Sequence, residues 1–296
     1  MEFRQLKYFV VVAEELHFGR AAERLHLTQP ALSKQIRRLE ELLDLRLFHR
    51  TKHQVQLTQA GQVFLERARQ LLEQAEQAVQ LAKRTARGEV GQLAIGFTTS
   101  ALHSVLPEMT QRFRDRYSSV ELTMIELCTE AQVEALLKGE VDVGFLHPPI
   151  RHKLIQLHPL LAEEFVVVLP KNHPLQECDR IPVMALARES FILHPREQGP
   201  VLYDQFFSLC QQLGFQPHVV QEHGMHQTRV GLVAAGIGVT FVPESVQPLV
   251  PASVVCRPIE GSNLKLELAA AWRKDDSSPV LREFLKVVKE SINQYF

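Results

Sequence analysis

The chain has 296 residues, of which 45% are hydrophobic, and a formal net charge of −1 at pH 7. Its length and composition suit more than one buried core, so we expect more than one domain. No uninterrupted apolar run approaches the ~20 residues of a membrane-spanning helix. Residues 1–90 hold 15 Lys and Arg against 11 Asp and Glu, whereas the remainder holds 18 against 23. The positive charge therefore lies in the N-terminal part, which favours a negatively charged partner there.

Residues 18–43 have the pattern of two helices separated by a tight break. The first helix supplies the small residues Ala21 and Ala22, with Leu25, for a close helix crossing. Thr28 then occupies an N-cap position, and we expect its hydroxyl to accept a backbone N–H of the second helix. Pro30 falls in the first turn of that helix, where a missing N–H costs nothing. This arrangement is typical of a helix-turn-helix.

The second helix has one apolar face and one polar, partly basic face. Spacings of four, three and four define the apolar face, which consists of Leu32, Ile36, Leu39 and Leu43. At about 100° per residue, the opposite side presents Pro30, Ser33, Lys34 and Arg37. Lys and Arg suit guanine edges and phosphates, and Ser suits a base or a phosphate. A solvated amphipathic helix has the same pattern, but the helix before it favours a DNA recognition helix.

The segment at 47–58 has the pattern of two short strands around a basic tip. This tip carries Arg50, Lys52 and His53. Such a hairpin after a helix-turn-helix predicts a wing that reaches toward the DNA backbone or the minor groove. We therefore expect a winged helix-turn-helix over residues 1–58, with double-stranded DNA as its partner.

These N-terminal residues resemble the DNA-binding domain of LysR-type transcriptional regulators. The matching segments are LKYF at 6–9, AAERL at 21–25, TQPALSKQI at 28–36, LE at 39–40, LFHR at 47–50 and LTQAG at 57–61. The resemblance implies that DNA is contacted by Gln29, Pro30, Ser33 and Lys34 from the helix and by Arg50 and Lys52 from the wing. It also implies an interrupted palindrome in a promoter as the DNA site, and RNA polymerase as a further partner.

Residues 59–87 form a long helical stretch without proline, whose only glycine, Gly61, lies near the start. Alternating steps of four and three predict a coiled-coil seam that consists of Phe64, Ala68, Leu71, Ala75, Ala78 and Ala82. Such a helix could pack on its own domain. It leads instead into a hinge-like break at 88–91, which favours pairing with a second copy so that two recognition helices read two half-sites. The resemblance implies the same dimer contact and a homotetramer built from two dimers.

From residue 88 onward, strand-like and helix-like segments alternate, which favours an α/β domain with mainly parallel sheets. We expect strands at 92–97, 120–126, 141–146, 165–170, 237–243 and 264–273, and helices at 102–117, 130–138 and 279–295. Two such sets with two chain crossings predict a cleft between two lobes. Lobe I spans about 91–161 and 267–296, and lobe II spans about 162–266.

Hydroxyl side chains follow the first two of these strands, where helices are expected to begin. They are Thr98, Thr99 and Ser100 after the first strand and Thr129 after the second. In open α/β sheets, ligands bind at the carboxyl ends of strands, where helix N-termini attract anions. A plain N-cap is the alternative for each hydroxyl taken alone. Their convergence on one cleft favours a site for a small carboxylate.

The C-terminal part resembles the effector-binding domain of the same family, which has the periplasmic-binding-protein fold. Segments GFTTS at 96–100, TEAQVEAL at 129–136, GFLHPP at 144–149 and GLVAAGIG at 231–238 look closest to activators of aromatic-acid catabolism and to the regulator of acetoin synthesis. The expected fold is thus an α+β multidomain chain. It comprises a winged helix-turn-helix at 1–58, a linker and dimerisation helix at 59–87 and a two-lobed α/β effector-binding domain at 88–296.

This second resemblance also implies roles for individual cleft residues. Ser100 and Thr129 would hold the effector carboxylate from one lobe, with Pro200 and Leu202 facing it from the other. The aromatic-acid regulators have arginine where this chain has His147, which favours a smaller or singly charged acid. His147 either makes effector binding pH-sensitive or has a structural role beside the proline pair that follows it.

The favoured function is a transcriptional regulator that responds to a small carboxylate, and two other classes stay open. A two-lobed solute-binding protein or an enzyme could share the C-terminal fold, but no signal peptide, catalytic motif or phosphate-binding loop is recognisable. A thiol-based redox regulator is the other class, and its candidates are Cys128, Cys178, Cys210 and Cys256. We expect no cofactor, no metal and no enzymatic activity, and a cytoplasmic protein that is associated with the nucleoid when bound.

Overall fold

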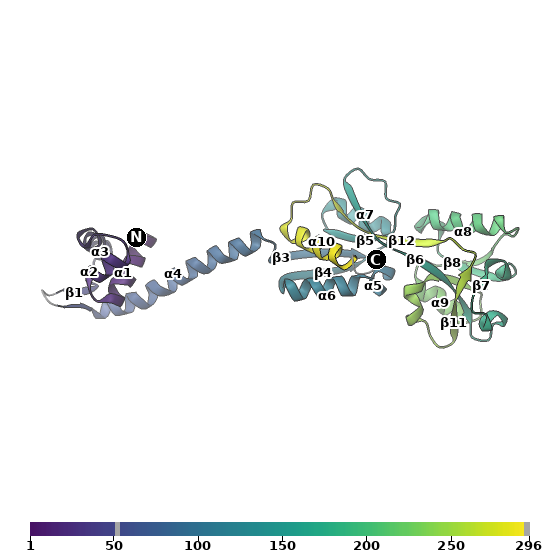
Figure 1. The fold of residues 1–296 in the computed structure, drawn as a ribbon, viewed down its shortest axis with the longest axis horizontal. Coiled ribbons are helices and arrows are strands. Elements are labelled where there is room, and N and C mark those ends of the chain that lie inside the picture. The colour runs from purple at the N-terminus through teal and green to yellow at the C-terminus, as the bar shows by residue number, and fades with distance from the viewer. Residues whose placement is uncertain (51–53, 293–296) are drawn as a thin grey trace. The chain divides into compact units, whose positions relative to one another are not determined.

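The computed structural model describes residues 1–50 and 54–292. The chain forms two compact units, Met1–Arg84 and Thr85–Phe296, which are considered one after the other (Figure 1). Within the described ranges, no helix is both long enough and apolar enough to cross a membrane.

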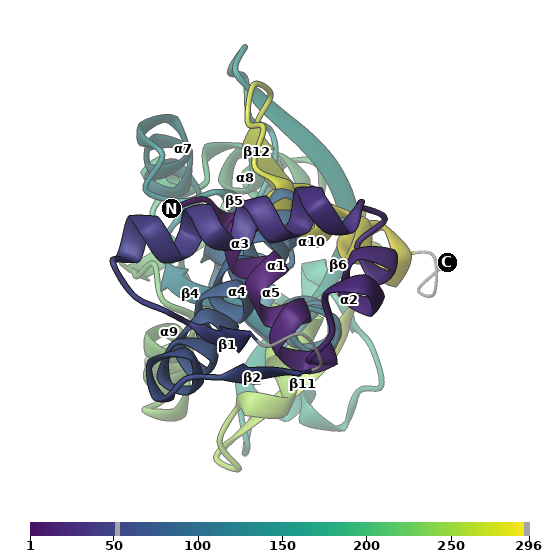
Figure 2. The ribbon, with the colours of Figure 1, turned by 90° about the vertical axis from the view of Figure 1, so that its left-hand side faces the viewer.

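The N-terminal unit consists of helices and one antiparallel pair of short strands (Figure 2). Its elements are α1 (Phe3–Glu15), α2 (Phe18–Arg24), α3 (Gln29–Leu43), the antiparallel strands β1 (Phe48–Arg50) and β2 (Val55–Leu57), and α4 (Gln59–Ala86). Phe9 is fully buried, and its ring lies 5.4 Å from that of Phe48 and 5.0 Å from that of Phe64. The apolar face of α3 completes this core with the fully buried Leu32, Ile36 and Leu39.

The turn between α2 and α3 follows the expected pattern, with two differences. Ala21 and Ala22 are buried, but Leu43, the last residue of the predicted apolar face, is only partly buried. Thr28 has the backbone conformation of an N-cap, yet its hydroxyl makes no capping hydrogen bond, so that prediction was wrong. An N-cap side chain bonds to the N–H of the second or third helical residue, and the second helical residue here is Pro30, which has no N–H.

Helix α4 begins in close contact with the hairpin. The Thr58 hydroxyl accepts the Gly61 N–H at 2.8 Å and donates to the backbone oxygen of Arg46 at 2.7 Å. A Cβ atom on Gly61 would lie 2.1 Å from the backbone oxygen of Leu47, so this close approach requires glycine. Beyond the buried Ala68, most side chains of α4 are exposed, including the seam residues Leu71, Ala78 and Ala82.

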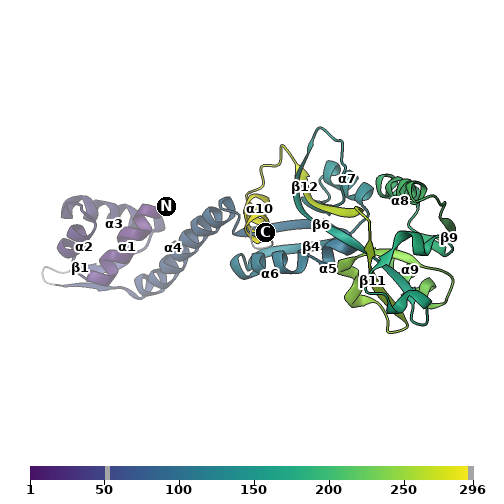
Figure 3. The ribbon, with the colours of Figure 1, turned by 45° about the vertical axis from the view of Figure 1, so that its right-hand side comes forward.

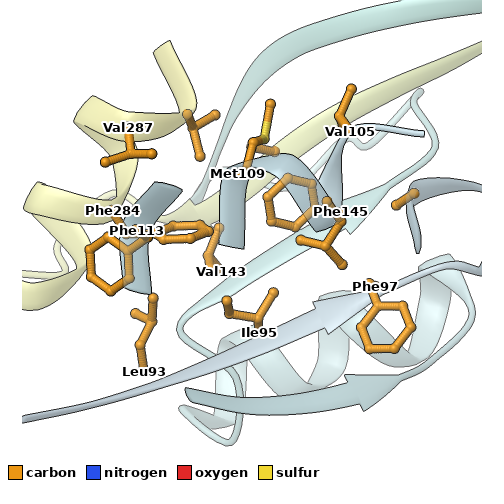
Figure 4. Packing of buried hydrophobic residues seen from close by; sticks show 14 of the residues in the cluster. Leu93, Ile95, Phe97, Val105, Met109, Phe113, Val143, Phe145, Phe284 and Val287 are labelled. Atoms are coloured by element: carbon orange, nitrogen blue, oxygen red, sulfur yellow. The ribbon is translucent and has the colours of Figure 1, made fainter. Parts of the chain in front are cut away.

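Lobe I of the C-terminal unit is a sheet with helices on both faces. Strand β3 (Val90–Phe97) pairs in parallel with β4 (Ser119–Glu126) and β5 (Val143–Leu146). The helices are α5 (Thr99–His103), α6 (Leu106–Arg116), α7 (Thr129–Lys138) and α10 (Pro279–Ile292). Phe284 of α10 lies between Phe113 of α6, at 5.1 Å, and Phe145 of β5, at 6.2 Å (Figure 4). These rings form the centre of the lobe I core, while α7 packs against the other face.

The single helix expected at 102–117 is instead two helices, α5 and α6. Ser104 leaves the helical conformation with φ −117° and ψ −92°. Pro107 follows in the first turn of α6, where its missing N–H costs nothing. In a continuous helix that N–H would have been needed, so the proline is compatible only with a new start.

Lobe II contains shorter strands and two helices. The strands are β7 (Ile181–Pro182), β8 (Ser190–Leu193), β9 (His218–Glu222), β10 (Thr240–Pro243) and β11 (Val254–Glu260). The helices are α8 (Pro200–Gln212) and α9 (His226–Ala234), with 3-10 turns at Pro174–Glu177, Val183–Leu186, Arg196–Gln198 and Glu244–Leu249. Phe191 is fully buried at the centre of this lobe, where its ring packs on Phe206 and Phe241.

Two long strands, β6 (Ile155–Pro170) and β12 (Lys265–Arg273), connect the lobes (Figure 3). They pair antiparallel along the whole of β12. On the lobe I side β12 pairs antiparallel with β5, and on the lobe II side β6 pairs antiparallel with β10 and β11. The sheets are therefore mixed rather than mainly parallel as predicted, because the two connecting strands run in opposite directions between the lobes.

Candidate functional site

The outward face of α3 presents the side chains that the sequence indicated for DNA contact. Gln29, Pro30, Lys34 and Arg37 are exposed, and Ser33 is half-buried. In the part of the chain that the structure describes, neither Lys34 nor Arg37 forms an ion pair. Both cations are therefore available to phosphates or base edges.

Arg50 of β1 forms an ion pair with Glu40 of α3. Its Nη2 donates to Oε2 of Glu40 at 2.9 Å, and its guanidinium lies 4.7 Å from the ring centroid of Phe18. Glu40 is only 3% exposed, and its Oε1 accepts the backbone N–H groups of Leu47 and Phe48 at 2.9 and 3.1 Å. Burial lowers the pKa of Arg50, while the charge of Glu40 opposes this shift. The side chain thus has a structural role, and its contact with DNA stays a prediction.

The other predicted wing residues, Lys52 and His53, follow β1 in the sequence. The last residue of β1, Arg50, is paired with the first residue of β2, Val55. Lys52 and His53 are outside the described residues, so their contacts stay predictions as well.

A cavity of about 1000 Å³ lies between lobe I and lobe II of the C-terminal unit. It is lined by all seven residues that the sequence indicated for the effector: Thr98, Thr99, Ser100, Thr129, His147, Pro200 and Leu202. The first five come from the carboxyl ends of β3, β4 and β5 and the helices that follow, and the last two come from the first turn of α8. The fold therefore brings segments from both lobes to one cavity.

His147 organises the polar groups on the lobe I wall. Its Nδ1 lies 2.8 Å from the backbone oxygen of Glu267, which can only accept, so Nδ1 carries the proton. Burial lowers the pKa of His147, although Glu267 and Glu130 oppose the shift. In the neutral ring Nε2 is an acceptor, and it lies 2.9 Å from Oγ of Ser100 and 3.2 Å from Oγ1 of Thr98.

The hydroxyl groups of this wall do not act as helix caps. Thr98 stands at the N-cap of α5 without a capping hydrogen bond. The Thr129 hydroxyl accepts the backbone N–H of His147 at 3.2 Å, and Thr99 donates to Oε1 of Glu126 at 2.6 Å. Cys128 at the N-cap of α7 provides no side-chain cap either. The alternative that these hydroxyls are plain N-caps is therefore wrong, because their hydrogen bonds are made to other groups at the cavity wall.

The lobe II wall contains polar residues that the sequence analysis did not single out, and the nitrogen-bearing side chains of interest come from two segments. His194 follows β8, and His226 and Arg229 lie in the first two turns of α9; Gln198 and Tyr203 also line this wall. The guanidinium Nη2 of Arg229 donates to Nδ1 of His226, and Nε2 of His194 lies 3.2 Å from the backbone oxygen of Gly199. An arginine that directly precedes the apolar run at 230–235 is the signal that could have revealed this group, since a buried face rarely takes a cation.

The four cysteines are free and distributed over different environments. Cys210 and Cys256 are buried, and burial raises their pKa values to about 12 and about 11. Cys178 is half-buried, and Cys128 is exposed at the cavity. Raised thiol pKa values disfavour the reactive thiolate at the two buried sites. The described residues contain no group of His, Cys, Asp and Glu that could hold a metal ion.

Comparison with known protein families identifies both parts of the chain. Residues 3–62 match the model of the bacterial regulatory helix-turn-helix protein, lysR family, and residues 86–293 match the LysR substrate binding domain. The chain is 44% identical to the HTH-type transcriptional regulator AlsR of Bacillus subtilis (strain 168), over 97% of this chain and 95% of AlsR.

Solved structures agree with this assignment. The full-length CbnR structure in complex with its target DNA has a TM-score of 0.86 at 28% identity, and covers 99% of this chain and 100% of CbnR. The BenM effector binding domain with its effector benzoate has a TM-score of 0.61 at 26% identity, and covers 69% of this chain and 91% of that domain. The winged helix-turn-helix and the two-lobed domain predicted from sequence are thus confirmed. The chain belongs to the LysR family of DNA-binding transcriptional regulators.

Proposed function

We propose that this LysR-type regulator responds to a small carboxylate bound in the cavity between lobes I and II. The observation that carries the proposal is the convergence of five polar side chains of lobe I on that cavity, opposite the first turn of α8: Thr98, Thr99, Ser100, Thr129 and His147. The benzoate-bound BenM domain supports the ligand class, because benzoate is a small carboxylate and that domain shares this fold.

Within the site, Ser100 and Thr129 are proposed to hold the carboxylate. Thr129 accepts a hydrogen bond from the backbone of His147, so its own hydroxyl proton is available to an anion. Ser100 is only 1% exposed, and its Oγ lies 2.9 Å from Nε2 of His147. Pro200 and Leu202 supply apolar contact from lobe II, and the first turn of α7 adds backbone N–H groups without a side-chain cap.

On the DNA, α3 is proposed to lie in the major groove of a promoter site. Base edges and phosphates would be contacted by Gln29, Pro30, Ser33, Lys34 and Arg37 from α3, and by Arg50, Lys52 and His53 from the wing. The exposed face of α3 and the similarity to DNA-bound CbnR support this placement. We further propose that α4 pairs two copies of the chain, and that dimers associate into tetramers on an interrupted palindrome and contact RNA polymerase.

The effector changes transcription only if it binds one arrangement of the oligomer better than another. A carboxylate that contacts both lobes meets this condition, since its contacts are complete only when the lobes are close. Closure would then alter the spacing of the DNA-binding units along the promoter, and with it the bend of the DNA.

Thermal unfolding in the presence of acetate, muconate and benzoate tests the carboxylate site. A ligand at 100 times its Kd adds about 2.7 kcal/mol to the free energy of unfolding, which raises the melting temperature measurably. We expect at least one of these acids to stabilise the wild type. Ser100→Ala should lose much of that shift, because a buried hydrogen bond to a charged group contributes about 1.5–3 kcal/mol.

Ser118→Ala is the matched control, since Ser118 is exposed and does not line the cavity. It should respond to the acids as the wild type does. The carboxylate proposal fails if none of the acids shifts the wild type, or if Ser100→Ala responds unchanged. A shift produced by thiol oxidants instead would point to the exposed Cys128 and to redox regulation.

A further inference from the structure

Arg229 is a cation inside the protein. It belongs to α9, lines the cavity and is only 3% exposed. Burial lowers the pKa of Arg229 to about 10, so its guanidinium stays charged at neutral pH. A charge in such a position is unfavourable unless an anion or a complete set of hydrogen bonds compensates it.

The described residues provide no anion for this charge. Nη2 of Arg229 bonds to Nδ1 of His226, which is a neutral acceptor, and Nε is buried without any hydrogen-bond partner. The carboxylates in or beside the cavity are Glu126, Glu130, Glu134 and Glu222. Among the residues that the structure describes, none of these carboxylates forms an ion pair with Arg229. The guanidinium thus has unused donors and an uncompensated charge.

The imidazoles near Arg229 complete an environment that favours an anion. Burial lowers the pKa of His194 and of His226, and the charge of Arg229 adds to both shifts. His147, His194 and His103 add further to the shift of His226. Because Nδ1 of His226 accepts from Arg229, the neutral His226 ring carries its proton on Nε2 and can donate it. Two adjacent side chains of α9 therefore offer donors to one incoming group.

We propose that Arg229 neutralises the carboxylate of the effector, which bridges from α9 on lobe II to the Ser100 and Thr129 hydroxyls on lobe I. This inference rests on the proposed function, because it concerns the same cavity and the same ligand class. It adds that the ligand must be an anion, and that the charge absent at His147 on lobe I is supplied from lobe II. An anion held from both lobes is also the kind of ligand that favours closure.

The test measures melting temperatures of the full-length wild type and of Arg229→Met, which removes the charge and keeps an unbranched side chain. Each protein is measured alone and with acetate, benzoate, acetamide and benzamide at neutral pH. Without ligand, R229M should melt at a higher temperature than the wild type, because an unpaired buried charge is replaced by an apolar group. With acetate or benzoate it should bind roughly 30-fold more weakly or worse, and the two amides should stabilise neither protein.

Arg229→Gln is the second variant, since it keeps a donor toward His226 without the charge. It should also lose the rise in melting temperature that acetate or benzoate produces. If R229M does not fold, R229Q alone tests whether Arg229 neutralises the carboxylate. If an acid stabilises the wild type and both variants equally, the Arg229 inference is overturned while the proposed function stands. If no acid stabilises the wild type, the proposed function fails. If no acid binds, the melting temperatures without ligand still test the Arg229 inference. A ligand-free R229M or R229Q that melts at a lower temperature than the wild type would overturn it.

Discussion

The proton on Nδ1 of His147 determines what the lobe I wall can offer a ligand. With the backbone oxygen of Glu267 accepting from Nδ1, Nε2 of the neutral ring accepts a hydrogen bond from the hydroxyl of Ser100 or Thr98. The hydroxyl of Ser100 then presents lone pairs to the cavity, and Thr129 remains the donor. A bound carboxylate would favour protonated His147, because Nε2 could then donate and free the Ser100 proton for the anion. Carboxylate binding at this wall is thus expected to be coupled to proton uptake.

The ligand-free protein should lose stability as the pH falls below about 6.5. The pKa values of His147, His194 and His226 are all lowered in the folded state, mainly by burial, from a usual value of 6.5. Below that pH the unfolded chain binds protons that the folded chain does not, so unfolding becomes easier. Each such histidine contributes a slope of up to about 1.4 kcal/mol per pH unit.

Urea unfolding curves between neutral and mildly acidic pH would measure this dependence. His226→Gln should flatten it, because one of the three protons is then absent from both states. His218→Gln is the control, since His218 is exposed on β9, and it should leave the slope as in the wild type. A slope that is the same for H226Q and the wild type would contradict the assignment.

At the scale of elements, the recognition helix and the wing are joined through one buried carboxylate. Glu40 on α3 binds two backbone N–H groups of the hairpin and the guanidinium of Arg50. Glu40→Gln would place an amide donor against Arg50 and remove the charge that holds it. We expect the N-terminal unit to lose about 2–3 kcal/mol, toward the low end for a broken buried pair because Arg50 keeps 27% of its side chain exposed.

Hydrogen exchange in the full-length protein would detect this change at the amides of Leu47 and Phe48. Their exchange should accelerate in E40Q, and affinity for promoter DNA should fall with it. Glu41→Gln changes the next residue of α3, which is exposed, and should leave both measurements unaltered. Unchanged exchange in E40Q would mean that the hairpin is held by other contacts.

Periodicity predicted the elements whose apolar and polar residues alternate regularly. It failed where another interaction determines where an element begins or ends. The apolar face of α3 and the extent of α4 follow from spacing alone. A strand was expected only over 165–170, whereas β6 already begins at Ile155 and contains Pro159, a residue that is unusual in a central strand. In the structure Pro159 lies at the register shift between Leu268 and Ala269 of β12, where a ladder hydrogen bond is already interrupted.

The candidate site was predictable from the sequence only in part. Hydroxyls at strand ends converge wherever parallel strands meet at one edge, so Ser100 and Thr129 could be named from the sequence. The apolar run after Arg229 could have indicated a buried arginine, but not its approach to the cavity, because that depends on how lobe II folds back through β6 and β12.

For the whole molecule, α4 carries an apolar seam that its own chain covers only at the start. Phe64 and Ala68 pack on the N-terminal core, whereas Leu71 is 42% exposed and Ala78 and Ala82 are exposed as well. An apolar seam of heptad spacing on an exposed helix is stable when a second helix covers it. This is the physical argument for the proposed dimer through α4, and it makes oligomerisation a precondition for reading two half-sites.

Ala78→Glu tests this dimer without disturbing the fold of the single chain, in which residue 78 is exposed. In a paired seam each copy would bury an uncompensated carboxylate, at a cost of roughly 3–5 kcal/mol, so dimer dissociation should become on the order of a hundredfold easier or more. Sedimentation velocity would show the shift to monomer. DNA affinity should fall, and its dependence on salt should become shallower because a monomer contacts fewer phosphates. Gln80→Glu adds the same charge on the side of α4 away from the seam, and should remain a dimer. Were A78E and Q80E to sediment alike, α4 would not be the dimer contact, and the two recognition helices would have to be joined through another surface.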